Sequence, residues 1–162
     1  MPRSERFRRS AGLLAYRRHA EGVLEVLLVH PGGPYWARRD AGAWSIPKGE
    51  HGPQEEALQA AQREFSEETG WSVQGPFLPL TPLRQPGGKW ISAWAVQAPH
   101  LDPSQLRSNR FSLEWPPHSG VQREFPEVDR AAWFQLPEAH ERLIAAQRAL
   151  LVELAGKLTG SL

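Results

Sequence analysis

The sequence contains no cysteine. A disulfide framework, a thiolate zinc site and a cysteine nucleophile are therefore excluded. It also contains no run of apolar residues long enough to span a membrane, and no apolar stretch of signal-peptide length follows the basic start of the chain. We therefore expect a cytoplasmic protein with no membrane partner.

The chain also has little net charge, because 19 Lys and Arg face 18 Asp and Glu, which leaves +1. This balance creates no overall field that would commit the protein to nucleic acid or to a membrane surface. The length of 162 residues suits a single domain with a real core. We expect a basic tail at residues 1–8 and one domain at 9–162, with no indication of the oligomeric state.

One stretch organises the sequence, and it predicts a helix over residues 53–69. Gly52 and Pro53 give a permissive start, and Gly70 suits a left-handed cap at the end. Ala57, Leu58, Ala61 and Phe65 share one face at helical spacing, which should pack on a core.

Three glutamates of this helix, Glu64, Glu67 and Glu68, stand at i, i+3 and i+4, so their carboxylates should form one cluster. A glutamate run is usually a solvated helix face. Here, however, Glu64 and Glu68 fall at the same angles as the apolar residues, so burial would be costly without a positive partner. Carboxylate oxygens at this spacing suit a hard divalent cation such as Mg2+.

Around the helix, the pattern predicts strands at residues 10–16, 23–30, 44–47, 71–73, 77–83, 89–96 and 131–135. Residues 114–130 are predicted to form a long irregular segment. Helical periodicity returns from residue 136, in one kinked helix or two. Strands, one acidic helix, more strands and a terminal helical segment predict the α/β class, with a mixed sheet between helical layers.

The full pattern resembles the signature of the Nudix hydrolases. Gly49, five residues, Glu55, seven residues and then the run from Arg63 to Trp71 match every specified position except Trp71, where an aliphatic residue is usual. The resemblance covers roughly residues 9 to 155 and implies an α/β/α sandwich with a central mixed β-sheet.

The resemblance also implies a pyrophosphohydrolase that cleaves a phosphoanhydride bond in a nucleoside diphosphate-linked substrate with Mg2+ or Mn2+. Carried over by position, Glu64, Glu67 and Glu68 would bind the metal, with the Gly49 carbonyl as a further ligand. Arg63 would belong to the catalytic set, and Glu55 and Gly70 would support it.

Residues before the helix carry a second resemblance. Trp44-Ser45-Ile46-Pro47-Lys48-Gly49 is similar to the arrangement in the dinucleoside polyphosphate and diphosphoinositol polyphosphate branches of the family. This similarity implies that Lys48 faces phosphates. Upstream, aromatic residues stand beside arginines in a loop, where they could stack on a base and clamp phosphates, or simply pin the loop to the core: Tyr35, Trp36, Arg38 and Arg39.

A carboxylate outside the helix should complete the site. In similar proteins of the polyphosphate branches a glutamate precedes a tryptophan of the last strand, and Glu127 lies six residues before Trp133. Glu124, nine residues before it, is the second choice, and Glu64 is the candidate base if neither acts.

The favoured partner is a nucleotide or polyphosphate, most of all a dinucleoside polyphosphate or a nucleoside triphosphate. Two alternatives stay open. One is RNA 5′-end processing, for which Arg3, Arg6, Arg8 and Arg9 could form a basic arm. The other is a catalytically silent nucleotide-binding module. A silent module is free to lose its glutamates, and none is missing here.

Overall fold

The structure, a computed structural model, describes residues 9–160. Its central feature is a seven-stranded sheet with the order β4-β6-β1-β2-β9, in which β3 also pairs with β1 and β5 with β6. β1 and β6 run parallel and the other pairs are antiparallel, so the sheet is mixed, as predicted. The strands are β1 (Arg9–Arg18), β2 (Leu24–Pro31), β3 (Lys48–His51), β4 (Phe77–Pro79), β5 (Leu83–Arg84), β6 (Trp90–Gln97) and β9 (Val128–Gln135).

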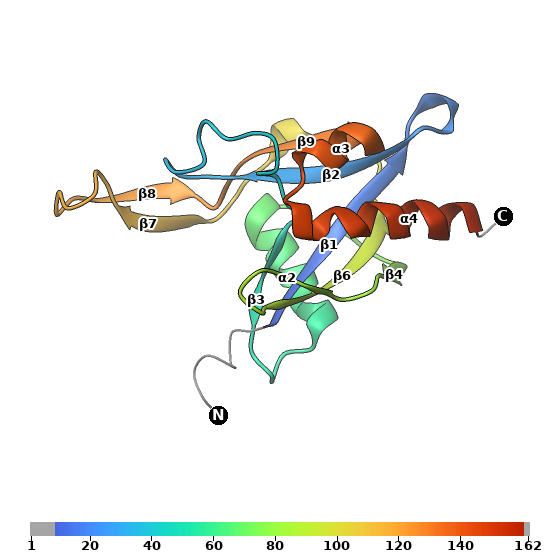
Figure 1. Cartoon of the computed structure of the whole chain (residues 1–162), viewed down its shortest axis with the longest axis horizontal. Helices are drawn as coiled ribbons and strands as arrows, with labels where there is room; N and C mark the ends of the chain where they lie inside the picture. Colours follow the sequence, from blue (N-terminus) through green and yellow to red (C-terminus); the bar gives the residue numbers. More distant parts are fainter. Residues whose placement is uncertain (1–8, 161–162) are drawn as a thin grey trace.

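Alternate side chains of β1 point to opposite faces of the sheet and contribute to two separate hydrophobic cores. Ala11, Leu13 and Ala15 point to the face covered by helix α2 (Ala57–Thr69), whereas Leu14 points to the opposite face. That opposite face is covered by α3 (Leu136–Arg142) and α4 (Arg148–Gly160). Short 3-10 turns lie at Ala20–Gly22, Pro103–Gln105 and Ala145–Gln147. Helices therefore lie on both sides of the sheet (Figure 1), which confirms the predicted α/β/α sandwich.

A second, two-stranded sheet extends from the body beside the loop that follows β2 (Figure 1). It pairs β7 (Arg110–Glu114) with β8 (Gln122–Pro126). The prediction of an irregular segment at 114–130 was therefore wrong for residues 114, 122–126 and 128–130, which lie in strands, and right for residues 115–121, which form the loop between β7 and β8. Phe111 and Phe125 face each other across the hairpin, and the apolar alternation of Phe111 and Leu113 is the strand signal that was available in the sequence.

Other boundaries also differ from the prediction. Residues 44–47 form only two isolated bridges, in which Ser45 pairs with Val29 and Trp44 with Leu143. Residues 71–73 form no strand, because the side chains of the preceding helix satisfy the backbone of Trp71: its N–H donates to Thr69 Oγ1 and its carbonyl accepts from Ser66 Oγ. The predicted strand at 77–83 is split into β4 and β5.

The terminal helical segment is two helices, α3 and α4, rather than one kinked helix. The arginines of the predicted basic arm, Arg3, Arg6 and Arg8, lie outside the described residues. No helix between residues 9 and 160 is long and apolar enough to cross a membrane.

Candidate active site

Helix α2 starts later than the sequence predicts, at Ala57 rather than at residue 53. Residues 52–55 form a turn in which the Glu55 N–H donates to the Gly52 carbonyl at 3.3 Å. Glu55 therefore precedes the helix instead of lying in its first turn. The C-terminal end is as predicted, because Gly70 adopts the left-handed conformation with φ 81° and its N–H donates to Ser66 O at 2.8 Å.

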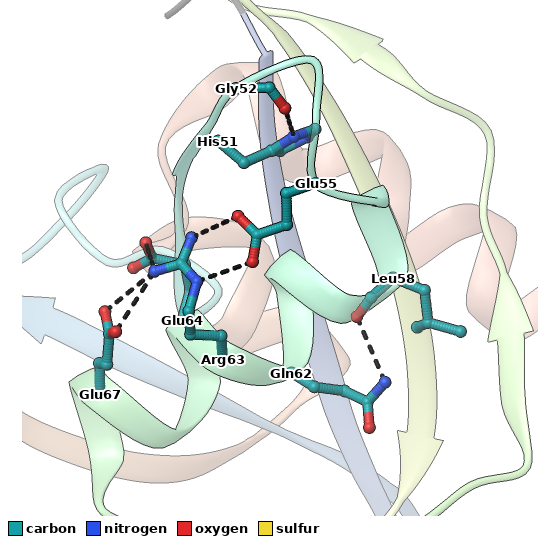
Figure 2. A network of polar contacts seen from close by, with 8 residues as sticks. All are labelled: His51, Gly52, Glu55, Leu58, Gln62, Arg63, Glu64 and Glu67. Carbon is teal, nitrogen blue, oxygen red and sulfur yellow. Dashed lines mark hydrogen bonds and ion pairs between the residues drawn. The ribbon is translucent and has the colours of Figure 1, made fainter.

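Arg63 is the centre of an ion-pair network on the exposed side of α2 (Figure 2). Its guanidinium binds both carboxylate oxygens of Glu55, from Nε at 2.8 Å and from Nη2 at 2.9 Å. Nη1 donates to Glu64 Oε1 at 2.9 Å and reaches the Glu67 carboxylate at 3.2 Å. One guanidinium thus holds three carboxylates, and its hydrogen bonds lower the pKa of Glu55.

Glu64 is enclosed between the helix and strand β3. Only 14% of its side chain is exposed, against 41% for Glu67. A Cβ on Gly49 would overlap the Glu64 carboxylate, so only glycine allows this close approach. The sequence prediction that Glu64 does not face solvent is therefore borne out by its position. Gly49 is therefore required for a steric reason, in addition to any metal-binding role of its carbonyl.

Glu68 lies one turn further along the helix, next to Lys48. Glu68, Lys48 and Glu127 line the same cavity of about 180 Å³, whose floor is formed by Val29, Ile46 and Val128. The structure therefore brings Glu127, which is 59 positions away from Glu68 in the sequence, into the carboxylate cluster. Glu124 lies on β8, exposed and opposite Ser112, and is not among the residues that line this cavity.

Burial raises the pKa of three carboxylates in this region, and neighbouring negative charges add to the effect at Glu64 and Glu68. Burial, reinforced by the charges of Glu64 and Glu127, raises the pKa of Glu68 to about 8, against the lowering effect of Lys48. Burial also raises the pKa of Glu64, although Arg63 opposes the change. Burial raises the pKa of Glu127 as well. Such a convergence of acidic groups is typical of functional sites.

Residues 107–109 connect Glu127 to the helix, a role that sequence analysis missed. The Asn109 N–H donates to the Glu67 carbonyl at 2.8 Å, and the Asn109 carbonyl accepts from the Glu127 N–H, also at 2.8 Å. Ser108 Oγ accepts from the N–H of Val128 at 2.9 Å. The segment from Ser108 to Asn109 thus binds the Glu67 carbonyl at the end of α2 and also holds the backbone N–H groups at positions 127 and 128.

The aromatic loop after β2 packs on the hairpin rather than on the carboxylate cavity. Tyr35 is 58% exposed and its ring meets that of Trp115 edge-on at 5.2 Å. Arg39 lies over the ring of Trp36, at 5.6 Å from its centroid. Among the residues that the structure describes, those lining the Glu68 cavity include none of the four predicted loop residues: Tyr35, Trp36, Arg38 and Arg39.

The loop is tied to the start of β9 through His30, a second feature that the sequence analysis did not identify. His30 is fully buried, with Nδ1 at 2.8 Å from Asp129 Oδ1 and Nε2 at 2.6 Å from the Arg39 carbonyl. The Gly32 N–H also donates to the Glu127 carbonyl at 2.9 Å. The base of the loop and the Glu127 segment therefore hold each other in place.

The donor set fits a hard divalent cation. All the candidate side-chain ligands are carboxylates, and two of them, Glu64 and Glu68, are partly buried with raised pKa values. Within residues 9–160, no three histidine or acidic side chains are already gathered to hold an ion. The carboxylates of Glu64 and Glu67 are bound to Arg63 instead.

A comparison with known protein families identifies the family of this chain. The model of the NUDIX domain matches residues 6–154. The chain belongs to the Nudix family. The assignment confirms the predicted enzyme class, a pyrophosphohydrolase that acts on phosphorus-containing anhydrides. Nudix hydrolases generally use divalent metal ions.

Solved Nudix structures share the fold. A C. elegans Ap4A hydrolase in a binary complex has a TM-score of 0.66 and 24% identity, over 93% of this chain and 98% of that one. A MutT/Nudix family protein from Listeria innocua has a TM-score of 0.61 and 20% identity, over 94% of each chain. The Nudix domain of Shewanella oneidensis NrtR, solved with ADP-ribose, has a TM-score of 0.55 and 18% identity, over 93% of this chain and 87% of that one. No curated protein matches the sequence.

Proposed function

We propose that this Nudix protein hydrolyses a phosphoanhydride bond in a nucleotide substrate with the help of Mg2+ or Mn2+. The observation that carries the proposal is the convergence of Glu127 on Glu68 and Lys48 in one cavity beside Glu64. A solvated acidic helix face would not bring a distant carboxylate and a lysine to the same place.

Glu64, Glu67 and Glu68 are the proposed metal ligands, with the Gly49 carbonyl as a further oxygen donor. When bound, the ion would neutralise phosphate oxygens and lower the pKa of a coordinated water. Before metal binding, Arg63 holds the carboxylates of Glu64 and Glu67 close together. After metal binding it would keep its ion pair with Glu55. Lys48 supplies a positive charge next to Glu68, where the phosphate chain of the substrate would lie.

Glu127 is the proposed general base, which takes the proton from the attacking water. Burial raises its pKa, which brings its proton affinity closer to that needed at neutral pH. Its backbone is fixed on both sides, by Asn109 through its N–H and by Gly32 through its carbonyl. A base held in this way loses little entropy when it reaches the reacting water.

The proposed substrate is a dinucleoside polyphosphate or a nucleoside triphosphate. Tyr35 and Trp36 are exposed beside Arg38 and Arg39, so the loop can offer ring surface to a base and charge to phosphates. The structural likeness to an Ap4A hydrolase agrees with a dinucleoside polyphosphate, and the likeness to a domain bound to ADP-ribose agrees with a nucleoside diphosphate-linked compound.

Substitutions in the cluster test the metal ligands. Glu67→Gln should reduce turnover by orders of magnitude, since it replaces a charged ligand oxygen by a neutral amide while the exposed side chain leaves the fold intact. The matched control is Glu141→Gln, an exposed glutamate of α3, which should hydrolyse at the wild-type rate. Wild-type turnover in Glu67→Gln would contradict the proposed ligand set.

A pair of loop variants tests the base. Glu127→Gln should lower kcat much more than it raises KM, because a proton acceptor acts mainly in the transition state. Glu124→Gln, three residues upstream, should leave both constants near the wild-type values. The reverse result would move the role to Glu124, and two unaffected variants would place the base in the helix, at Glu64.

A further inference from the structure

A second cavity, of about 490 Å³, opens beyond the N-terminal end of α2, on the same side of the sheet as that helix. Its walls come from the first residues of β1 and β6, the end of β3 and the turn before the helix. We call it the Trp90 pocket. Trp90 lines it with 49% of its surface exposed, although an indole of this size is usually covered.

Strand register places cationic side chains on both sides of Trp90. Arg9 of β1 is its parallel partner and Arg84 of β5 its antiparallel partner, while His51 of β3 pairs with Arg9 on the far side. Directly paired residues point to the same face of a sheet, so the four side chains form one row across four strands. Arg9, His51 and Trp90 of this row line the pocket, whereas Arg84 is not among its lining residues and its Nη2 lies near Gly88.

The start of α2 adds further positive potential to the pocket. The helix has 13 residues, and its N-cap residue, Glu56, makes no side-chain hydrogen bond to the first turn. The N–H groups of this turn therefore remain available to an anion, at the positive end of the helix dipole. Ala57, the first helical residue, lines the pocket beside Arg9 and Trp90.

Two glutamates line the pocket and reduce this positive potential, but the carboxylate of one of them is already engaged. Glu55 lines it, but both oxygens of its carboxylate are bound to Arg63 (Figure 2). Glu50 is paired with Lys89. Glu56 remains as an exposed carboxylate at the rim, where it could accept hydrogen bonds from sugar hydroxyls.

We propose that the Trp90 pocket binds a nucleotide unit, with the base stacked on Trp90 and the phosphate between Arg9 and the start of α2. Aromatic stacking combined with flanking cations is the general chemistry for holding a base and its phosphate. The pocket is distinct from the cavity of Glu68 and Glu127. Glu64 lies seven positions after Ala57, or about 10 Å along the helix.

The direct test is titration with AMP in the presence of a chelator, so that no metal ion can hold phosphate at the carboxylate cluster. Spectra of the 15N-labelled indole groups should show a saturable shift of the Trp90 resonance, which is assigned by its loss in Trp90→Phe. By calorimetry, Trp90→Ala should weaken AMP binding about fivefold or more, as expected for the loss of one base stack. Trp90→Phe should retain most of the affinity.

Two further variants complete the test. Arg9→Ala should weaken AMP binding and reduce its dependence on salt, because Arg9 lines the pocket, and it keeps the proposal testable if Trp90→Ala does not fold. The matched control is Arg123→Ala, at an exposed arginine of β8, which should change the affinity less than about twofold, against the larger loss expected for a removed stack in Trp90→Ala. A Trp90 resonance that does not move, or AMP affinity that falls as far in Arg123→Ala as in Trp90→Ala, would overturn the proposal.

Hydrolysis kinetics then show whether the nucleotide in the Trp90 pocket is one half of the substrate or a separate ligand. If the pocket holds the far half of the substrate, Trp90→Ala should raise KM for a dinucleoside tetraphosphate but not for ATP. If both KM values are unchanged while AMP binding is lost, the pocket is a separate nucleotide site. Because AMP binding is measured without metal, its loss in Trp90 variants is independent of any loss of hydrolysis in Glu67→Gln.

Discussion

In the metal-free protein, Glu68 should make stability fall as the pH rises. Its pKa is about 8 in the folded chain, against an ordinary value of 4.5. Between these two values the folded protein keeps a proton that the unfolded chain has released, so each increase in pH favours unfolding. Glu64 and Glu127 also have raised pKa values and add to the effect in the same direction.

The expected size follows from the Glu68 shift. One pKa unit corresponds to about 1.4 kcal/mol, so complete deprotonation of Glu68 would cost about 5 kcal/mol. Over the range from about pH 5 to pH 7.5, the free energy of unfolding should fall by about 3 kcal/mol. Lys48 lies beside Glu68 and limits the loss, since its charge lowers the pKa.

Urea unfolding, followed by tryptophan fluorescence in a chelating buffer, measures this dependence. Glu68→Gln should remove most of the slope and be more stable than the wild type at pH 8, with little difference at pH 5. Glu141→Gln should keep the wild-type slope. The reasoning is refuted if the wild-type stability is constant or rises over this range, or if Glu68→Gln retains the full slope.

Two further substitutions test the packing and the ion pairs around the cluster. Gly49→Ala should lower the melting temperature and weaken Mn2+ binding in a calorimetric titration, since its methyl group would displace the Glu64 carboxylate; Gly52→Ala, where nothing lies within 4 Å of the added carbon, should change neither. Arg63→Lys should cost about 1–2 kcal/mol of stability in urea unfolding, because an ammonium group cannot reproduce the paired bonds to Glu55. Stability equal to that of the wild type would show that this pair contributes nothing.

The signature helix could be predicted because its information is local. Helical spacing and Gly70 determine which faces of α2 are buried and where it ends. The start could not be predicted, because Pro53 is equally suited to the turn that the chain adopts there. Glu55 leaves the helix so that its carboxylate can reach Arg63, eight positions away, and this ion pair depends on tertiary geometry.

The part of the site that contains Glu127 depends on contacts between residues that are far apart in the sequence. Glu127 reaches Glu68 because Asn109 binds both the helix end and the Glu127 backbone, and no spacing in the sequence indicates such a bridge. The hairpin of β7 and β8 could have been identified from the alternation of Phe111 and Leu113. The row of Arg9, Trp90 and Arg84 depends on strand register, which the separate strand patterns do not fix.

Product analysis over a substrate panel tests the central claim most directly. The panel comprises dinucleoside polyphosphates, nucleoside triphosphates, ADP-ribose, capped RNA and diphosphoinositols, each incubated with Mg2+, with Mn2+ or with chelator. The account predicts metal-dependent release of nucleotide products, with dinucleoside polyphosphates cleaved fastest. Cleavage of ADP-ribose or a non-nucleotide diphosphate alone would contradict the substrate preference. Absence of cleavage of every compound with either metal would contradict the proposed hydrolysis itself.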